Sequence, residues 1–336
     1  MNGRSAGRQS RPRRDRGLAL LITLLVVALL VVVTMEFGRS IWHQYLVADG
    51  LGRGARLGAI ARSGVVLGKV LLEQDGAEDS QADSLLARWA IDDDTDLSAL
   101  FDEGVLELRI TDESGRLQVN SLALQGAGGE ALRQSLLNLL LSGGFRIEGD
   151  SEARTIVDSL VDWIDEDDQE QEMGAETGYY RAAGKEYGCR NAPVRTVEEL
   201  LLVRGISRKL LFGGEGLKAL ADFITVYGED GKININTAPL EVLAALNPLM
   251  NADLGRSLDD FRRDSDNGPL LADPGWYLRV PSWPGDVTFD PQLITTSSRY
   301  FSIAATGSDG NGKRKLTAVV GRDARGIVGE LFRRVE

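Results

Sequence analysis

The longest apolar run of the chain extends from Leu18 to Met35 and contains eighteen residues without a formal charge. A helix of this length reaches roughly 27 Å at about 1.5 Å per residue, which is close to the hydrocarbon thickness of a bilayer. The stretch from Arg11 to Arg16, just ahead of the run, is rich in arginine. Because basic flanks stay on the cytoplasmic side, we predict a single-pass anchor over residues 18–37 with a cytoplasmic N-terminus and an extracytoplasmic main domain.

The helical period continues beyond this apolar run. Apolar and small residues recur at spacings of three and four at Ile41, Tyr45, Ala48, Leu51, Ala55 and Ala59. This spacing predicts one helix up to about Leu72. Glycines inside it each cost about 1 kcal/mol relative to alanine, so we expect close helix–helix approach or local melting there. A cleaved secretory signal is the alternative, but the run exceeds the apolar segment of such signals and no small-x-small site follows Phe37.

Period-two alternation appears after an acidic link over residues 73–99, which we expect to be helical. Residues 105–110 alternate apolar and polar, the sequence DESG marks a turn at 112–115, and residues 116–120 alternate again. We therefore predict a hairpin whose sheet covers the long helix.

A helical period returns between residues 129 and 230, where Leu132, Leu136 and Leu140 share one face. Strand signals follow at residues 232–236 and in a closing hairpin formed by residues 300–306 and 315–320. The predicted fold class is α+β: a long N-terminal helix packed on an antiparallel sheet, interrupted by a large inserted helical domain. We place the first strands in 38–128, the inserted helical domain in 129–230, and the closing strands in 231–336.

Charge is distributed unevenly along the chain. The whole chain carries −12 and residues 1–17 carry +5, so the remainder carries −17. Such an acidic body repels phosphate backbones, and we expect no nucleic-acid partner. Cys189 and His43 are the single cysteine and histidine, which excludes an intramolecular disulfide and a Ser-His-Asp site. We expect Cys189 to be a small buried side chain, His43 to lie at the membrane interface, and the protein not to be an enzyme.

The densest cluster of carboxylates lies between Asp162 and Glu176. Asp165, Asp167 and Glu176 occupy positions 1, 3 and 12 of an EF-hand frame, which suits an oxygen-seeking cation such as calcium. The frame then fails, because Glu170 stands where an EF-hand turn needs glycine. The residues alone leave two interpretations open: a calcium loop of another kind and a solvated acidic loop.

The segment 232–241, KININTAPLE, is similar to the entry of a helix-hairpin-helix, a module that binds the DNA backbone. The module needs a glycine-rich turn that presents backbone amides to phosphate, and residues 246–250 contain no glycine. We therefore expect a structural role in which Thr237 caps a helix that begins near Pro239. A membrane-anchored DNA receptor remains the alternative. For Trp276, Tyr277 and Trp283 we expect packing in the core.

The N-terminus resembles a prepilin peptidase site, because a basic leader over residues 1–17 ends at Gly17 and the apolar helix starts at Leu18. Type IV pilins and most type II secretion pseudopilins have glutamate at the fifth position of the mature chain, whereas this chain has Ile22. One subclass also lacks this glutamate, the minor pseudopilin K, or general secretion pathway protein K. The segments DESGRLQVNSL, LVDWIDEDDQE and KININTAPLEVLAAL extend the resemblance over nearly the whole chain.

The resemblance implies a pilin-like fold, with a helix-hairpin-helix-like segment and the closing strands in 231–336. It implies a subunit of the bacterial inner membrane with a periplasmic domain, located at the tip of the pseudopilus that drives export of folded proteins. The implied partners are the prepilin peptidase, membrane lipid and the minor pseudopilins of the I and J types. Family members bind calcium in the inserted domain, and the candidate ligands here are Asp165, Asp167, Asp168 and Glu176. A minor type IV pilin is a further alternative.

Overall fold

The computed structural model describes residues 14–77, 82–91, 97 and 100–336. The chain divides into two compact units, Met1–Leu57 and Gly58–Glu336. Residues 1–13 of the predicted leader lie outside the described part. Of the predicted acidic link, residues 78–81, 92–96 and 98–99 also lie outside it.

A single α-helix, α1 (Arg14–Ala77), contains the apolar run and continues well beyond it. The side chains from Leu18 to Met35 are exposed, and α1 is the one described helix that is long and apolar enough to cross a membrane. Within the second unit, residues 58–77 of α1 are partly buried: Ile60, Ala61, Val65 and Leu72 belong to the core. The helix therefore ends five residues after the predicted Leu72.

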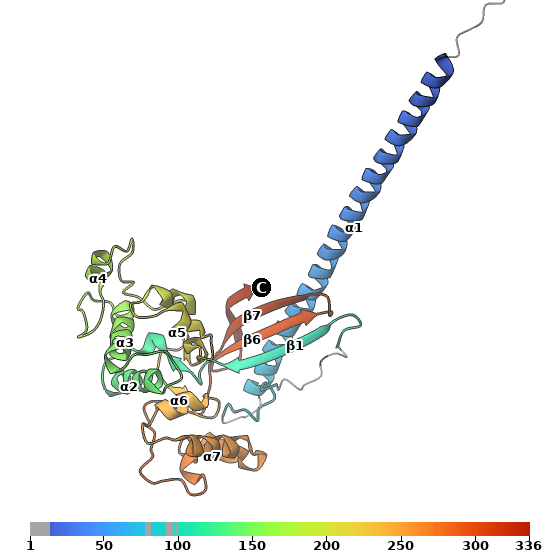
Figure 1. Ribbon diagram of the computed structural model, residues 1–336. Coiled ribbons are helices and arrows are strands. Elements are labelled where there is room, and N and C mark those ends of the chain that lie inside the picture. The colour runs from blue at the N-terminus through green and yellow to red at the C-terminus, as the bar shows by residue number, and fades with distance from the viewer. Residues whose placement is uncertain (1–13, 78–81, 92–96, 98–99) are drawn as a thin grey trace, which may run out of the picture. The chain divides into compact units, whose positions relative to one another are not determined.

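A four-stranded antiparallel sheet has the order β1-β6-β7-β8, with bounds β1 (Val105–Asp112), β6 (Tyr300–Ser308), β7 (Lys313–Arg322) and β8 (Val328–Val335). Inward and outward residues alternate along β6, as expected for a strand with one covered face. The predicted closing hairpin is confirmed, since Ile303 pairs with Ala318 across β6 and β7. Figure 1 shows these strands beside the C-terminal part of α1.

Two glycines allow α1 to approach the sheet closely. A Cβ added to Gly64 would lie 2.6 Å from Leu106 Cδ1, and one added to Gly68 would lie 2.8 Å from Ile303 Cγ2. No larger side chain fits these positions without a shift of helix or sheet. The expected helix–helix approach is thus replaced, at these two positions, by an approach between helix and sheet.

The predicted hairpin between residues 105–110 and 116–120 is wrong. β1 pairs instead with β6, and β2 (Leu117–Gln118) pairs in parallel with β3 (Ile224–Thr225). The turn after β1 carries the chain from the sheet into the helical part, where Leu117 and Val119 are buried. The alternation of residues 105–110 does mark a strand, but residues 119–121 form a 3-10 helix, and both strands find their partners in distant segments.

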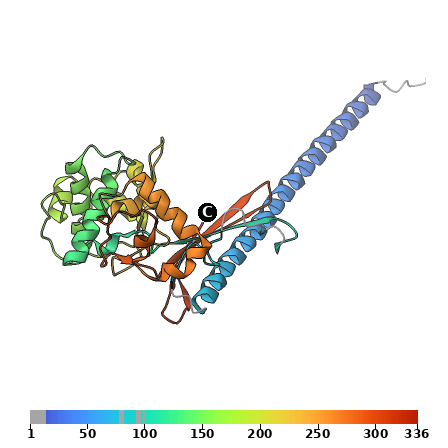
Figure 2. The same ribbon diagram turned by 90° about the horizontal axis from the view of Figure 1, so that it is seen from below.

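The remaining elements form one helical body, seen in Figures 1 and 2 as the green, yellow and orange helices. Its elements are η2 (Val119–Ser121), α2 (Ala127–Leu141), α3 (Asp150–Ile164), α4 (Thr177–Ala182), η3 (Val197–Leu202), α5 (Arg208–Phe212), η4 (Leu220–Asp222), β4 (Ile233–Asn234), α6 (Leu240–Ala245), α7 (Ala252–Arg263), η5 (Ser265–Ala272), η6 (Trp276–Arg279) and β5 (Ile294–Thr295).

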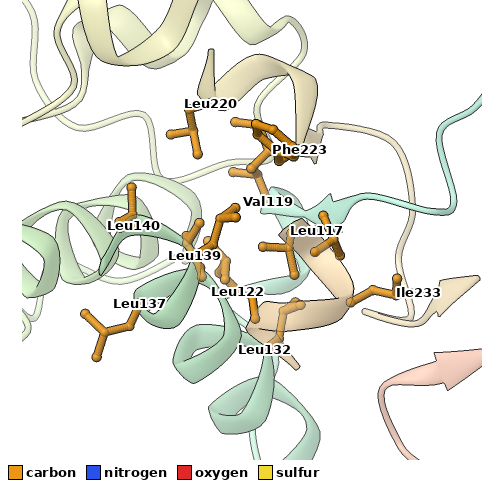
Figure 3. Close-up of a cluster of buried hydrophobic side chains, with 14 of the residues drawn as sticks. Leu117, Val119, Leu122, Leu132, Leu137, Leu139, Leu140, Leu220, Phe223 and Ile233 are labelled. Carbon is orange, nitrogen blue, oxygen red and sulfur yellow. The ribbon is translucent and has the colours of Figure 1, made fainter. Parts of the chain in front are cut away.

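One continuous core fills this body, and it extends from Leu117 to Ile294. Figure 3 shows Val119 of η2 and Leu139 of α2 lying close to Leu122 and Phe223. The predicted division between residues 230 and 231 therefore does not coincide with a boundary of the core. Trp276 and Tyr277 are buried in the same core, as expected, and the Tyr277 ring lies 4.6 Å from that of Phe289.

Residues 82–91 of the link form turns and are not helical, contrary to the prediction. Their one large aromatic residue, Trp89, is buried with its ring edge-on to Phe301 at 5.1 Å. Burial of Trp89 against the sheet therefore positions this segment, which the acidic composition had suggested to be a helix.

A buried polar cluster surrounds Asp112 at the end of β1. Its Oδ1 accepts a hydrogen bond from Ser114 N (2.7 Å), and its Oδ2 accepts bonds from Thr237 Oγ1 (2.5 Å), Asn234 Nδ2 (3.2 Å) and Ser298 Oγ. The predicted capping role of Thr237 is wrong, because Pro239 takes the N-cap position of α6 and no side chain caps that helix. The Thr237 hydroxyl is used by Asp112 instead.

Alanine at Gly68 should destabilise the fold, whereas alanine at Gly58 should not. The close approach of Ile303 makes the Gly68→Ala change cost about 1–3 kcal/mol. At Gly58 the nearest atom is Arg62 Nη1 at 3.5 Å, so the gain in helix propensity stabilises the chain by about 0.5–1 kcal/mol. Urea unfolding of the detergent-solubilised chain measures both changes, and equal effects would contradict the close packing.

Stability should depend on pH through Asp112. Burial raises the pKa of Asp112 from 3.8 to about 6. A carboxyl group that holds its proton more tightly when folded stabilises the fold less as the pH rises from about 4 through 6. Between pH 4 and 7 the unfolding free energy of the wild type should fall by roughly 2–3 kcal/mol relative to Asp112→Asn, which does not titrate. A constant difference over this range would contradict the shift.

Candidate metal centre

The acidic cluster predicted from the sequence is built by the end of one helix and the start of the next. α3 ends at Ile164, and Asp165 leaves it in an extended conformation. The chain then turns and returns to Glu176, which takes the N-cap position of α4. The loop between the two helices thereby brings Asp165 and Glu176 together, although eleven positions separate them in the sequence.

Three of the four predicted ligands converge. One carboxylate oxygen from each of Asp165, Asp167 and Glu176 lies within 4.8 Å of the others. Calcium–oxygen distances are about 2.3–2.6 Å, so oxygens with this spacing can bind one ion together. The oxygen-only donor set is of the kind that hard cations prefer.

Unsatisfied buried oxygens support this fit. Glu176 is only 5% exposed, and both of its carboxylate oxygens lack a hydrogen-bond partner. Asp165 Oδ1 is likewise buried without a partner. Buried carboxylates without partners are costly, and a bound cation is the partner that this geometry can accommodate.

Asp168 does not join the three converging carboxylates. Its Oδ1 accepts a hydrogen bond from Asn191 Nδ2 at 3.2 Å, and the same amide nitrogen donates to the carbonyl oxygen of Asp167 at 2.6 Å. The amide oxygen of Asn191 is buried without a partner. Asn191, which has a φ of 48°, is thus an additional candidate ligand that the sequence analysis missed. The tolerance of asparagine for positive φ was its only local signal.

The pKa values of Asp165 and Glu176 are raised, because both carboxyl groups are partly or fully buried and lie close to other carboxylates. Burial first, and then the charges of Asp162 and Asp165, raise the pKa of Glu176 to about 7. Burial and the charge of Asp167 raise the pKa of Asp165. A divalent cation would reverse both shifts, because it favours the ionised carboxylates.

Asp162, in the last turn of α3, holds the loop through hydrogen bonds to its backbone. It accepts hydrogen bonds from Ala175 N (2.6 Å) and Gln171 N (3.0 Å), and burial raises its pKa to about 6. A Cβ on Gly174 would lie 1.9 Å from Asp162 Oδ2, so only glycine allows the loop to close on this carboxylate. Both carboxylate oxygens of Asp162 therefore accept hydrogen bonds from backbone amides of the loop.

Neighbouring side chains hold the loop from the other side. Arg204 donates from Nη1 to the carbonyl oxygen of Gly174 (2.7 Å), and its guanidinium lies over the Tyr179 ring at 4.4 Å. Cys189 is half-buried and donates from Sγ to the carbonyl oxygen of Asp162 at 3.1 Å. Burial and the charge of Glu176 raise the pKa of the Cys189 thiol to about 12, so it stays protonated.

The predicted cleavage site lies in regular helix. Gly17, Leu18 and Ile22 are all exposed residues of α1. No atom beyond its chain neighbours and the helix backbone lies within 4 Å of a Cβ built at Gly17. The peptide bond between Gly17 and Leu18 is thus covered by no other described segment.

The helix-hairpin-helix-like segment lies in the interior. Residues 233–236 are all buried, and the side chains of Asn234 and Asn236 donate to carbonyl oxygens of the chain itself. Residues 233–236 therefore have a packing role.

Comparisons with known proteins agree on one family. Residues 115–229, which contain the acidic cluster, match the family model of type II secretion system (T2SS), protein K. The type II secretion system protein K of Aeromonas hydrophila is 27% identical over 91% of this chain and 93% of its own length. Its counterpart in Pseudomonas aeruginosa is 27% identical over 94% of this chain and 91% of its own length.

The fold also has a solved relative. It is similar to a chain in the crystal structure of the GspK-GspI-GspJ complex from enterotoxigenic Escherichia coli, with a TM-score of 0.64 and 18% sequence identity. The match covers 86% of this chain and 99% of that chain, so the two share the fold along nearly their whole length. The family model, the relatives and the shared fold thus agree that the chain is similar to type II secretion system protein K.

Proposed function

We propose that this chain is a minor pseudopilin at the tip of the periplasmic pseudopilus, where it initiates or caps assembly for the export of folded proteins. One observation carries the proposal: in a chain similar to type II secretion system protein K, a helix that starts with an exposed apolar run continues into a segment covered by an antiparallel sheet. The first part suits lipid or sister helices, and the second part suits a folded head domain. The role is structural and requires no reaction.

The membrane topology follows from the charges. Arginines between residues 11 and 16 keep the N-terminus in the cytoplasm, and the acidic body is placed in the periplasm. A prepilin peptidase cuts between Gly17 and Leu18 and thereby frees the amine of Leu18. The inner membrane holds α1 until it packs against sister helices.

A position at the tip agrees with Ile22 and with the size of the helical body. In pilins the glutamate at this position is thought to neutralise the N-terminal amine of a neighbouring subunit. Ile22 cannot do so, and a subunit without this carboxylate needs no neighbour above it. Stacked copies of the helical body would clash along a narrow shaft, which favours few copies at one end.

Other minor pseudopilins, of the I and J types, are the proposed partners. The solved relative was determined as a GspK-GspI-GspJ complex, and this chain covers 99% of the matched chain. A shared fold of this extent supports a shared set of partners.

We further propose that the acidic cluster binds calcium through Asp165, Asp167 and Glu176, with Asn191 as an additional ligand. The buried oxygens without partners support the site. Bound calcium would tie the end of α3 to the start of α4 and the segment around Asn191. Asp168 is not among the proposed ligands, because its Oδ1 accepts from Asn191 and it lies outside the three converging carboxylates.

Processing at Gly17 should be required for secretion. In a host strain without its own copy, the wild-type chain should restore export of a secreted enzyme, and mass spectrometry of the membrane fraction should find a mature chain starting at Leu18. Gly17→Val should stay unprocessed and fail to restore export. Gly38→Ala, at another exposed glycine of α1, should behave like the wild type. A wild-type chain that keeps its first seventeen residues, in a host that processes its other pilins, would overturn the assignment.

Calcium should stabilise the wild type and not Glu176→Gln. At a calcium concentration one hundred times the Kd, binding adds about 2.7 kcal/mol to the unfolding free energy. Thermal unfolding in calcium and in chelator, together with titration calorimetry, measures this gain. In chelator, Glu176→Gln should be at least as stable as the wild type above pH 7, because it removes a buried charge whose pKa is raised to about 7.

Asp168→Asn is the matched control for this experiment. It removes a neighbouring carboxylate that lies outside the three converging groups, so calcium should still stabilise it. Loss of the calcium effect in Asp168→Asn but not in Glu176→Gln would show that the proposed ligands are the wrong ones.

A further inference from the structure

Four segments of the chain meet where α1 ends, and a buried ion triplet lies at their meeting point. It consists of Asp75 near the end of α1, Asp83 in the segment that follows, and Arg322 at the end of β7. The side chains are only 9% (Arg322), 8% (Asp75) and 7% (Asp83) exposed. The fourth segment, residues 296–298, leads from the helical body into β6.

Arg322 contacts three of these segments and the sheet. Nη1 pairs with Asp75 Oδ2 at 3.0 Å, and Nη2 pairs with Asp83 Oδ1. Nη2 also donates to the carbonyl oxygen of Ser298 at 3.2 Å, and the guanidinium lies 5.0 Å from the Phe301 ring centroid. The planar fork of arginine suits such divided contacts, which a lysine ammonium cannot reproduce.

Asp83 extends the connection into the helical body. Its Oδ2 accepts from Ser298 N at 2.6 Å, while its carbonyl oxygen accepts from Asn234 Nδ2 (3.0 Å) and Asn236 Nδ2 (3.1 Å). Asn236 Nδ2 also donates to the carbonyl oxygen of Leu271 in η5, at 3.0 Å. A continuous path of hydrogen bonds thus leads from α1 through Arg322 and Asp83 to β4 and η5.

Asp112 at the end of β1 provides a second buried connection between sheet and body, because its Oδ2 accepts from Asn234 Nδ2 and Thr237 Oγ1. The exposed polar contacts are weaker. Arg334 of β8 pairs with Glu198 of η3 at 2.7 Å, but both side chains are about half exposed. Exposed ion pairs contribute little, because water screens the charges and the side chains lose entropy. Tyr227 stacks on Tyr300 at 6.2 Å, which adds contact area but little directional constraint.

We propose that Arg322 is a positioning residue that locks the helical body at a fixed orientation relative to residues 58–77 of α1 and the sheet. Buried ion pairs gain little net stability over apolar replacements, but their geometry is specific. Burial works to lower the pKa of Arg322, yet Asp83 and Asp75 outweigh it and hold this pKa above its ordinary value. The guanidinium therefore stays charged, and both carboxylates keep it in place.

The fixed orientation set by Arg322, called the lock below, extends the proposed tip function, and its biological purpose rests on that function. A body that partners must recognise at one end of a filament has to be presented at one angle to the helix that enters the filament. The chain passes between sheet and body twice, near residues 112–117 and 295–300. Two connecting segments alone do not fix the angle between the two parts, so the contacts around these segments determine it.

The fixed orientation can be tested by measuring a distance between sheet and body in the detergent-solubilised full chain. Spin labels on Lys313→Cys in β7 and Ser257→Cys in α7, with Cys189→Ser, report the distance between sheet and body. Lys313 and Ser257 are exposed. We expect a narrow distance distribution in the wild type and one at least twice as wide in Arg322→Met. Arg322→Lys should lie between them, because it keeps the charge but not the fork.

Arg325→Met is the matched control, since its partner Asp323 lies two positions away in the same turn and Arg325 is 78% exposed. It should leave the distribution unchanged. Should Arg322→Met fail to fold, Asp83→Asn performs the same test, because it removes the charge that pairs with Arg322 Nη2 on the path from the sheet to the body. An unchanged width in a variant with a cooperative unfolding transition overturns the lock. A variant that loses secretion while its distance distribution keeps its width also overturns the lock. A widened distance distribution supports the lock even where secretion is unaffected.

Discussion

One helix has to suit two solvents, and this constraint shapes the molecule. In hydrocarbon every backbone polar group must be satisfied within the segment, which leaves a helix as the form for a single span. The same helix then continues into water, where its apolar side chains need a cover. The sheet provides it, and Gly64 and Gly68 give up helix propensity so that the strands can approach the helix closely. Burial of Leu106, Ile110 and Ile303 on this face offsets the cost of the glycines.

The acidic loop follows a different logic. Asp162 is fully used by the loop backbone, and this leaves Asp165 and Glu176 to face each other with unsatisfied oxygens. Charges of one sign in a buried place destabilise the loop unless a cation is present. The proposed calcium ion would stabilise this loop locally, beside the apolar core that extends from Leu117 to Ile294.

The junction between sheet and helical body is polar, unlike the cores on either side of it. Asp83 and Asp112 are buried there, the Arg322 side chain is only 9% exposed, and each is satisfied by donors or acceptors from segments far apart in sequence. Such a network contributes less to stability than to the choice of one arrangement, because an unpaired member would be strongly penalised. This network is the basis of the proposed fixed orientation between the sheet and the helical body.

The sequence by itself determined the features that depend on local composition and period. The apolar run of α1, the closing hairpin of β6 and β7 and the helical character of α2 and α3 all follow from patterns within short windows. The convergence of Asp165, Asp167 and Glu176 was also accessible, because all three lie in one loop. Only the tertiary structure decided which strands pair, that Thr237 donates to Asp112 instead of capping a helix, and that the Asn191 side chain lies beside Asp167 and Asp168. These outcomes depend on contacts between residues many positions apart, and their free energy comes from burial and hydrogen bonds that no local pattern encodes.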